Sequence, residues 1–82
     1  MADFHYVYIL ASEPAPGRPY VGVTRDLSKR LAAHNAGKSP HTAKYRPWRI
    51  RAAIALPDRR KALALEQYLK SHSGRAFTSK HL

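Results

Sequence analysis

The chain lacks cysteine altogether and has only five acidic residues among 82. Without cysteine there can be neither a disulfide framework nor a zinc site built on thiolates. No apolar run approaches the roughly 20 residues that a membrane-spanning helix needs, and no signal-peptide pattern opens the sequence. So short a chain cannot build two hydrophobic cores. We therefore expect one cytoplasmic domain over residues 1–82, with a core at 4–75 and a basic tail at 76–82.

The scarcity of acids leaves a large positive charge. Fifteen Lys and Arg stand against five Asp and Glu, which gives a formal net charge of +10. Such a field favours polyanions, with nucleic acid the first candidate. An anionic membrane is the second, but the sequence has no basic amphipathic helix with bulky apolar residues to insert into lipid. The alternative without a binding function is that the positive charge only keeps the protein soluble. We expect a nucleic-acid partner and no membrane.

Apolar runs and turn signals divide the first half of the chain. Residues 4–11 are aromatic and β-branched and predict a strand, and residues 20–24 predict a second one. Residues 12–19 are rich in proline and connect the two strands, most simply as an antiparallel hairpin. Asp26 is the expected N-cap of a helix that stops at Gly37, and residues 38–47 are polar, basic and typical of a loop.

The second half predicts one more strand and one more helix. Residues 48–56 alternate between apolar and other side chains, which predicts a half-buried strand with Trp48, Ile50, Ala52, Ile54 and Leu56 on one face. Asp58 is expected to cap a helix that runs to about residue 71, with Gly74 as its stop and at most one further helical turn in the tail. The order β-β-α-β-α predicts an α+β domain, a small three-stranded antiparallel sheet flanked by helices.

Glu66 is the one acid in the body of a predicted helix. It shares a face with Ala62, Leu65 and Leu69, which should meet the sheet, whereas the other acids lie near the terminus, in the turn and at the two caps. A buried carboxylate is costly unless it is paired or binds a cation. A salt bridge to one of the many basic residues is the structural explanation. A ligand to a hard cation is the functional one, because one carboxylate with water and phosphate oxygens is a typical Mg²⁺ arrangement.

Arg30 and His34 raise a similar question on the first predicted helix. They lie four residues apart on the stripe of Leu27 and Leu31 that should face inward. Arginine can extend its charged end to solvent, and histidine is often a core residue with its hydrogen bonds satisfied. Alternatively, the guanidinium clamps a phosphate and the imidazole carries a proton.

Three tyrosines fall in or next to the predicted hairpin strands: Tyr6, Tyr8 and Tyr20. Packing explains most tyrosines in strands. A phenol held near cations or a metal can instead lose its proton and act as a general base or activate water.

These residues occur in an order that resembles the GIY-YIG nucleases. Tyr6-Val7-Tyr8 and Tyr20-Val21-Gly22 resemble the two short motifs that name the family. Residues 25–35 resemble its first helix, with an arginine and a following histidine or tyrosine, and residues 64–70 resemble the helix that carries the metal-binding glutamate. Each tripeptide alone is a weak signal, but the ordered set is strong and covers nearly the whole chain. The short stand-alone bacterial members, similar to an excinuclease subunit, resemble it most.

The resemblance implies a metal-dependent endonuclease, with DNA favoured over RNA and a role in repair or recombination. Tyr8 or Tyr20 would activate water, Arg30 would steady the phosphate, and His34 would assist proton transfer or orient a tyrosine. Glu66 would hold one Mg²⁺ or Mn²⁺ ion. Gly22 would let the backbone pass close to the site. We expect the five polar side chains to converge on one concave surface.

Some features leave the function open. Tyr6 replaces the first motif glycine, and a late polar residue, asparagine in some relatives, has no clear counterpart; Thr78 and Ser79 are the nearest polar side chains. The alternatives are a basic binding module that keeps the fold without catalysis and a structural RNA-binding protein. A domain this small buries little DNA, so a protein partner or a homodimer could supply specificity. The residues expected to contact nucleic acid lie in or beside the loop after the first helix: Lys38, His41, Lys44, Arg46, Arg49 and Arg51.

Overall fold

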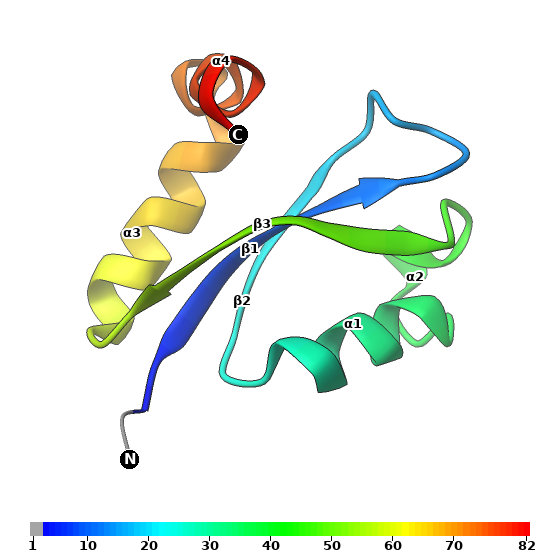
Figure 1. Ribbon diagram of the computed structural model, residues 1–82, viewed down its shortest axis with the longest axis horizontal. Coiled ribbons are helices and arrows are strands. Elements are labelled where there is room, and N and C mark those ends of the chain that lie inside the picture. Colours follow the sequence, from blue (N-terminus) through cyan, green and yellow to red (C-terminus); the bar gives the residue numbers. More distant parts are fainter. Residues whose placement is uncertain (1–2) are drawn as a thin grey trace.

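The computed structural model describes residues 3–82 and confirms an α+β architecture (Figure 1). Along the chain the elements are β1 (His5–Ser12), β2 (Tyr20–Thr24), α1 (Leu27–Asn35), α2 (Pro40–Ala43), β3 (Trp48–Leu56), α3 (Arg59–Lys70) and α4 (His72–His81). The strands form one antiparallel sheet in the order β2-β1-β3. No helix in this part of the chain is long and apolar enough to cross a membrane.

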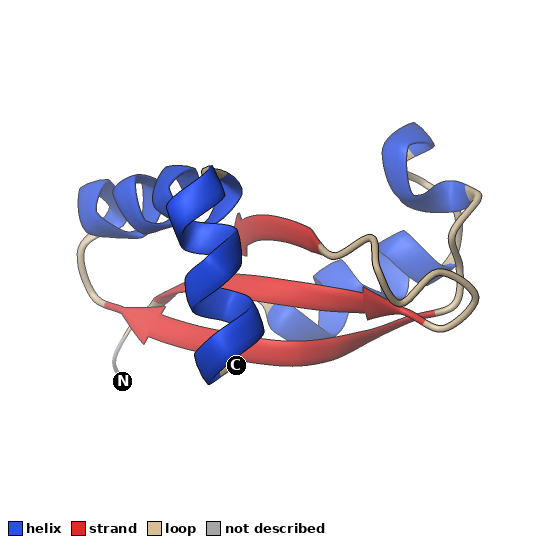
Figure 2. Ribbon diagram, turned by 90° about the horizontal axis from the view of Figure 1, so that it is seen from above, coloured by secondary structure: helices blue, strands red, loops and turns tan. Residues whose placement is uncertain are grey.

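The central strand β1 is buried on both faces, because helices cover the sheet on both sides. Figures 1 and 2 show α3 and α4 on one side of the strands and α1 and α2 on the other. Val7 and Ile9 pack with Ala62 and Leu69 of α3. The alternate residues Tyr8 and Leu10 form a second core with Trp48, against which Leu27 and Leu31 of α1 pack. Because side chains along β1 alternate between the two faces of the sheet, this strand contributes residues to two separate cores.

A bulge in β3 corrects the predicted single apolar face of this strand. Ile9 pairs with Ala52 but Leu10 pairs with Ile50, so Arg51 is an extra residue between the two pairs. Such an insertion reverses the alternation of side chains. Ala52 therefore packs in the core below α3, while Trp48 packs in the core below α1. A strict period of two could not predict this change of face.

The predicted helix starts are confirmed. The Asp26 carboxylate accepts a hydrogen bond from the Lys29 amide at 3.0 Å, and the Asp58 carboxylate accepts one from the Arg60 amide at 2.8 Å. Each satisfies a backbone N–H that has no partner within its helix. The first helix also ends just before Gly37, as expected.

In the C-terminal part, the predicted end of α3 at about residue 71 is confirmed, but the stop at Gly74 and the single further turn in the tail were wrong. α3 stops at Lys70, and Ser71 caps α4, which runs for ten residues where at most one turn was expected. Gly74 lies inside α4, where a Cβ atom would overlap the carbonyl oxygen of Tyr68. The glycine thus permits α4 to fold back tightly on the end of α3. The short helix α2, inside the predicted loop, is too brief to leave a periodic pattern.

Candidate active site

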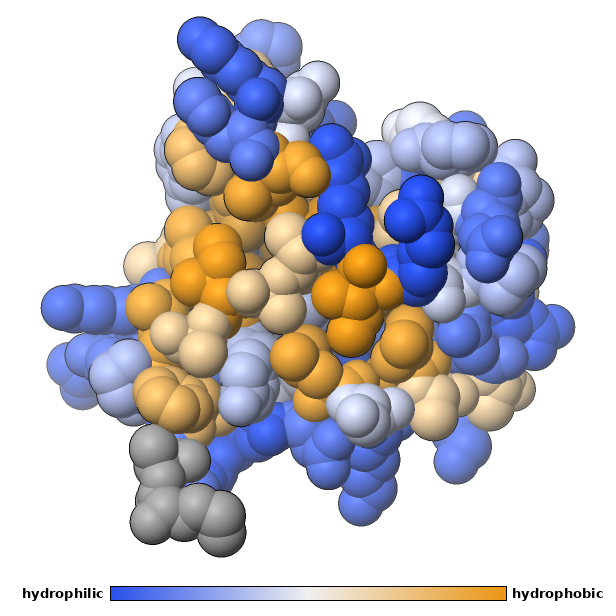
Figure 3. Space-filling model, viewed as in Figure 1, coloured by the Kyte–Doolittle hydropathy of each residue, from blue (hydrophilic) through white to orange (hydrophobic). Residues whose placement is uncertain are grey.

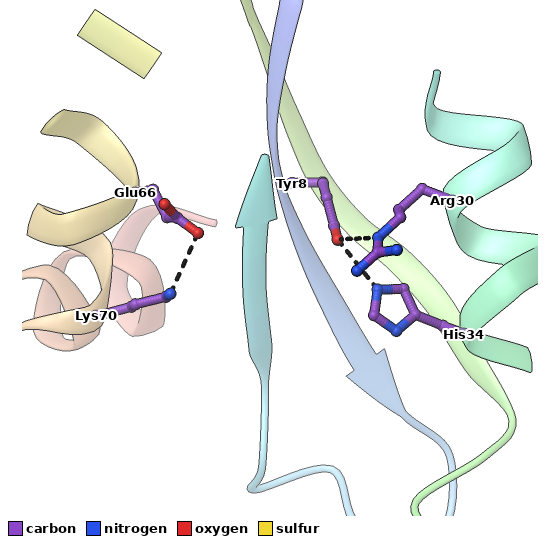
Figure 4. A network of polar contacts seen from close by, with 5 residues as sticks. All are labelled: Tyr8, Arg30, His34, Glu66 and Lys70. Carbon is purple, nitrogen blue, oxygen red and sulfur yellow. Dashed lines mark hydrogen bonds and ion pairs between the residues drawn. The ribbon is translucent and has the colours of Figure 1, made fainter. Parts of the chain in front are cut away.

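The Tyr8 hydroxyl is the centre of a buried polar cluster (Figure 4). Its oxygen lies 3.0 Å from Nε2 of His34 and accepts a hydrogen bond from Nε of Arg30 at 3.3 Å. Tyr8 comes from the central strand, and both partners come from the inward stripe of α1. Tyr8 and His34 are only 2% and 1% exposed. The structure thus brings together three of the predicted site residues.

Gly22 makes room for the Tyr8 side chain. The two residues are directly opposite each other in the β1–β2 register. A Cβ atom at residue 22 would overlap the Tyr8 hydroxyl oxygen and lie 2.6 Å from Cζ of the ring. The phenol therefore lies across the β2 backbone at the only kind of residue that leaves space for it. The family resemblance implied that Gly22 lets the backbone pass close to the site, and the close approach observed is that of the Tyr8 ring to the β2 backbone.

Tyr20 lies beside the same cluster. Its ring centroid is 5.0 Å from that of His34 and 6.3 Å from that of Tyr8, and it also contacts Trp48 edge-on at 6.4 Å. Tyr20 is half-buried, so it is more accessible than Tyr8. Both motif tyrosines therefore meet at the imidazole of His34.

Thr42, on α2, is a site residue that the sequence did not reveal. Its hydroxyl lies 2.8 Å from Nδ1 of His34 and donates to the Ser39 carbonyl at 3.4 Å. Because the Thr42 hydroxyl donates its hydrogen bond to the Ser39 carbonyl, the Thr42 oxygen accepts a hydrogen bond from Nδ1–H of His34. Nε2 of His34 is then left with a lone pair, to which the Tyr8 hydroxyl donates. No sequence signal marked Thr42, because it stands in a polar stretch typical of a loop.

The charges of the cluster are set by burial and by Arg30. Burial lowers the pKa of His34, and the positive charge of Arg30 lowers it further, so the imidazole is neutral at neutral pH. Burial raises the pKa of Tyr8, although the hydrogen bond and charge of Arg30 oppose this, so the phenol keeps its proton. The hydrogen bond to Tyr8 raises the pKa of Arg30, which stays charged. The cluster thus contains a proton donor, a neutral proton acceptor and a fixed cation.

Glu66 does not join this hydrogen-bonded cluster. Figure 4 shows Glu66 and Lys70 on one side of β2 and Tyr8, Arg30 and His34 on the other. The Glu66 carboxylate pairs with Nζ of Lys70 at 3.2 Å, and its side chain is 15% exposed. It is still close enough for its charge to contribute to the raised pKa of Tyr8. Four of the five side chains therefore lie together, but Tyr8 and His34 are buried and do not line a concave surface, and Glu66 lies across the edge strand.

The residues at Glu66 suit a hydrated divalent ion better than an enclosed metal site. In residues 3–82, no group of three or more His, Asp or Glu is arranged to hold a metal. Glu66 offers one carboxylate, and a further ligand set would have to come from water and phosphate oxygens. Mg²⁺ is commonly bound in this way, through one or two carboxylates and substrate. The donor set therefore fits such an ion, while the ion pair with Lys70 shows that the structural explanation is also realised.

The late asparagine has no counterpart at Asn35. The Asn35 amide binds the backbone N–H and C=O of Trp48, at 2.6 and 3.0 Å, and so joins the end of α1 to β3. Thr78 is buried in α4, and Ser79 next to it is exposed. Asn35 is thus a structural link between α1 and the sheet.

The residues predicted to bind nucleic acid divide between two locations. Five of them are exposed on or near α2 and the start of β3: Lys38, His41, Lys44, Arg46 and Arg49. Arg51 is also exposed, but its guanidinium donates to the carbonyls of Leu82 and Thr78 at 3.3 and 3.4 Å. It therefore holds α4 and does not belong with the loop group, because the bulge separates it from its neighbours in β3.

Comparisons with known proteins agree with this geometry. Residues 4–80 match the GIY-YIG catalytic domain. The chain is 36% identical to a UPF0213 protein of Cupriavidus pinatubonensis, over 83% of its own length and 74% of that protein. A UPF0213 protein of Halalkalibacterium halodurans is 38% identical over 87% of this chain and 74% of that protein.

A longer relative carries an activity in its name. The structure-specific endonuclease subunit SLX1 of Scheffersomyces stipitis is 40% identical over 78% of this chain, which spans only 21% of that protein. No solved structure matches the chain significantly. The match over nearly all residues means that the chain belongs to the GIY-YIG family.

Proposed function

We propose that this GIY-YIG domain is a metal-dependent endonuclease that hydrolyses phosphodiester bonds in DNA, in repair or recombination. The observation that carries the proposal is the buried Tyr8 hydroxyl, held between the neutral imidazole of His34 and the charged guanidinium of Arg30. A core tyrosine needs only one hydrogen-bond partner. A phenol between a proton acceptor and a cation is arranged for proton transfer beside an anionic substrate.

Arg30 is suited to hold the phosphate. It uses Nε for Tyr8, and the residue is exposed, so its terminal nitrogens remain available to phosphate oxygens. In this position the guanidinium stabilises the charge that develops on phosphorus during attack.

Tyr8 and His34 provide a route for the proton of the attacking water. As the water oxygen bonds to phosphorus, its proton passes to a tyrosine oxygen, and the bond to the leaving ester oxygen breaks. Tyr8 can release its own proton to Nε2 of His34, 3.0 Å away, in the same step. Tyr20 is more accessible, and we assign to it the orientation of the water. The leaving oxygen is then protonated from solvent.

Glu66 would hold Mg²⁺ or Mn²⁺, which when bound supplies further stabilisation of negative charge on the phosphate and the leaving group. For this, the carboxylate must give up part of its pairing with Lys70. A non-catalytic binding module is the second candidate, and the same ion pair is the observation that favours it.

A cleavage panel separates the two candidates. Purified chain is incubated with single-stranded, duplex, nicked and branched DNA in Mg²⁺, Mn²⁺ or chelator; branched substrates are included because the longer SLX1 relative is named a structure-specific endonuclease subunit. Glu66→Gln should lose cleavage by orders of magnitude while binding in chelator stays equal or tightens slightly. Glu13→Gln, the same charge change at an exposed loop residue, is the control and should cut normally. Wild type that cuts nothing, with Glu66→Gln binding identically, would establish the binding module.

A further inference from the structure

A groove separate from the loop group lies between the β1–β2 connection and α4. Its volume is about 660 Å³, and Ile9, Val21 and Leu69 contribute apolar side chains to its lining. Figure 3 shows the surface notched between α4, at the upper left, and the β1–β2 connection, at the upper right, with hydrophilic residues bordering the notch. The groove lies on the side of the sheet that α3 covers.

The charge of the groove is of one sign. Arg18, Arg51, Lys70 and Arg75 line it, and no acidic residue is among its lining residues. The Arg51 guanidinium already donates hydrogen bonds to the carbonyl oxygens of Thr78 in α4 and of Leu82 just after it. The other three cations are exposed, and they come from the connection, the end of α3 and the start of α4. Cations from three elements around one concavity form a field that suits a chain of phosphates.

Two residues link the groove to the candidate active site. Tyr20 lines the groove and also lies against His34, with ring centroids 5.0 Å apart. Lys70 lines the groove and also pairs with Glu66 at 3.2 Å. A strand in the groove would therefore lie beside Lys70, the partner of Glu66, and would reach Tyr20, whose ring contacts the tyrosine cluster on the other side of the edge strand.

We propose that this groove binds a single strand of nucleic acid that continues into or out of the cleavage site. Its volume is that of a small-ligand pocket and is too small for a duplex. A positively charged groove with an aromatic side chain on which a base can stack is typical of surfaces that bind single strands, and Tyr20 is the aromatic residue of this lining. The proposal rests on the proposed function only for the role of the strand, since the groove could bind it without any cleavage.

Occupation of the groove has a consequence for Glu66. A phosphate near Lys70 competes with the carboxylate for the same ammonium group, whose side chain is 47% exposed. Binding of the strand thus frees Glu66 for a cation.

The test measures binding in chelator, so cleavage does not enter. A labelled oligothymidylate of about ten nucleotides, within the usual range for such sites, is titrated by fluorescence anisotropy at several salt concentrations. Arg18→Gln with Arg75→Gln should weaken binding about tenfold and reduce the salt slope by about 1.4, because two phosphate contacts are lost. The matched control is Arg59→Gln with Lys61→Gln, an equal charge change at exposed residues of α3 that do not line the groove.

The control pair should change affinity less than about twofold, and a blunt duplex should be almost insensitive to the groove pair. In NMR titrations of the wild type, the amide signals of Gly17 and Ser79, both in the groove lining, should move.

Three results would overturn the proposal. Equal losses in the groove and control pairs would mean that only net charge matters. Equal losses for duplex and single strand would mean that the groove contacts duplex backbone. A loss confined to Lys38→Gln with Lys44→Gln would move the strand to the α2 side. Absence of cleavage with every metal would overturn the proposed function and leave the binding result intact.

Discussion

Replacing Gly22 with alanine tests whether Tyr8 is fixed where the structure has it. The new methyl group would overlap the hydroxyl oxygen and lie 2.6 Å from Cζ and 3.0 Å from Cε1. The ring has little freedom to withdraw, because Tyr8 is 2% exposed and its oxygen is bonded to His34 and Arg30. The alanine must therefore push the phenol away from at least one partner.

The expected loss of stability follows from three contributions. Overpacking a core costs about 1–3 kcal/mol. Weakening a buried hydrogen bond to the phenol adds about 1 kcal/mol. Alanine also lowers the conformational entropy of the unfolded chain, which offsets about 0.5–1 kcal/mol of the loss in stability. We expect Gly22→Ala to lower the free energy of unfolding by about 2 kcal/mol.

Urea titration followed by fluorescence measures this loss, because Trp48 is the single tryptophan and packs in the same core as Tyr8. Gly17→Ala is the control, since a Cβ atom there has no neighbour within 4 Å, and it should be neutral or slightly stabilising. Gly22→Ala should also lose cleavage under conditions where it remains folded. Wild-type stability together with wild-type cleavage would show that Tyr8 does not need this position.

Two further predictions concern His34. Thr42→Val keeps the shape of the side chain but leaves Nδ1–H of His34 without an acceptor, so we expect the free energy of unfolding to fall by about 1–3 kcal/mol. The ¹⁵N shifts that report the tautomer of His34 should change and cleavage should weaken, and Thr42→Ser should restore all three properties. An unchanged tautomer in Thr42→Val would refute this role of Thr42. The pKa of His34 is lowered from 6.5 in the folded chain, so below pH 6.5 the folded chain binds fewer protons at His34 than the unfolded chain. The contribution of neutral His34 to stability is therefore fully present above pH 6.5 and is lost as the pH falls through the lowered pKa. His34→Gln should flatten this acid limb in urea titrations, and an identical limb in both proteins would assign it to other groups.

The local structure was largely predictable because it depends on local chemistry. Asp26 and Asp58 cap the helices that they were expected to cap, and the strand bounds from Trp48 to Leu56 agree with the alternating pattern. The inward stripe of α1 likewise placed Arg30 and His34 next to the hairpin. Capping, alternation and helical period are each determined within a few residues, so a single sequence is enough to recognise them.

The features that the sequence did not predict correctly depend on contacts between residues that are distant in the sequence or lie in different elements. Nothing local distinguishes Arg51 as a bulge, since its neighbours alternate regularly on both sides. Gly74 has the usual signature of a helix stop, and only the approach of α4 to the Tyr68 carbonyl shows why a glycine is needed inside a helix. Thr42 lay in an apparent loop, and its role depends on a histidine eight residues earlier in another helix.

The position of Glu66 follows from the two-sided sheet. A helical face rich in alanine and leucine indicates that α3 meets the sheet, but not which face of the sheet it meets. Successive β1 residues point to opposite faces, so Tyr8 belongs to the α1 side while Val7 and Ile9 hold α3 on the other. In Figure 4, β2 lies between Glu66 and the tyrosine cluster, and the Tyr8 ring approaches the backbone of that strand at Gly22. Under the proposed function, a substrate that contacts both groups would pass around β2, the edge strand whose Tyr20 and Val21 also line the groove.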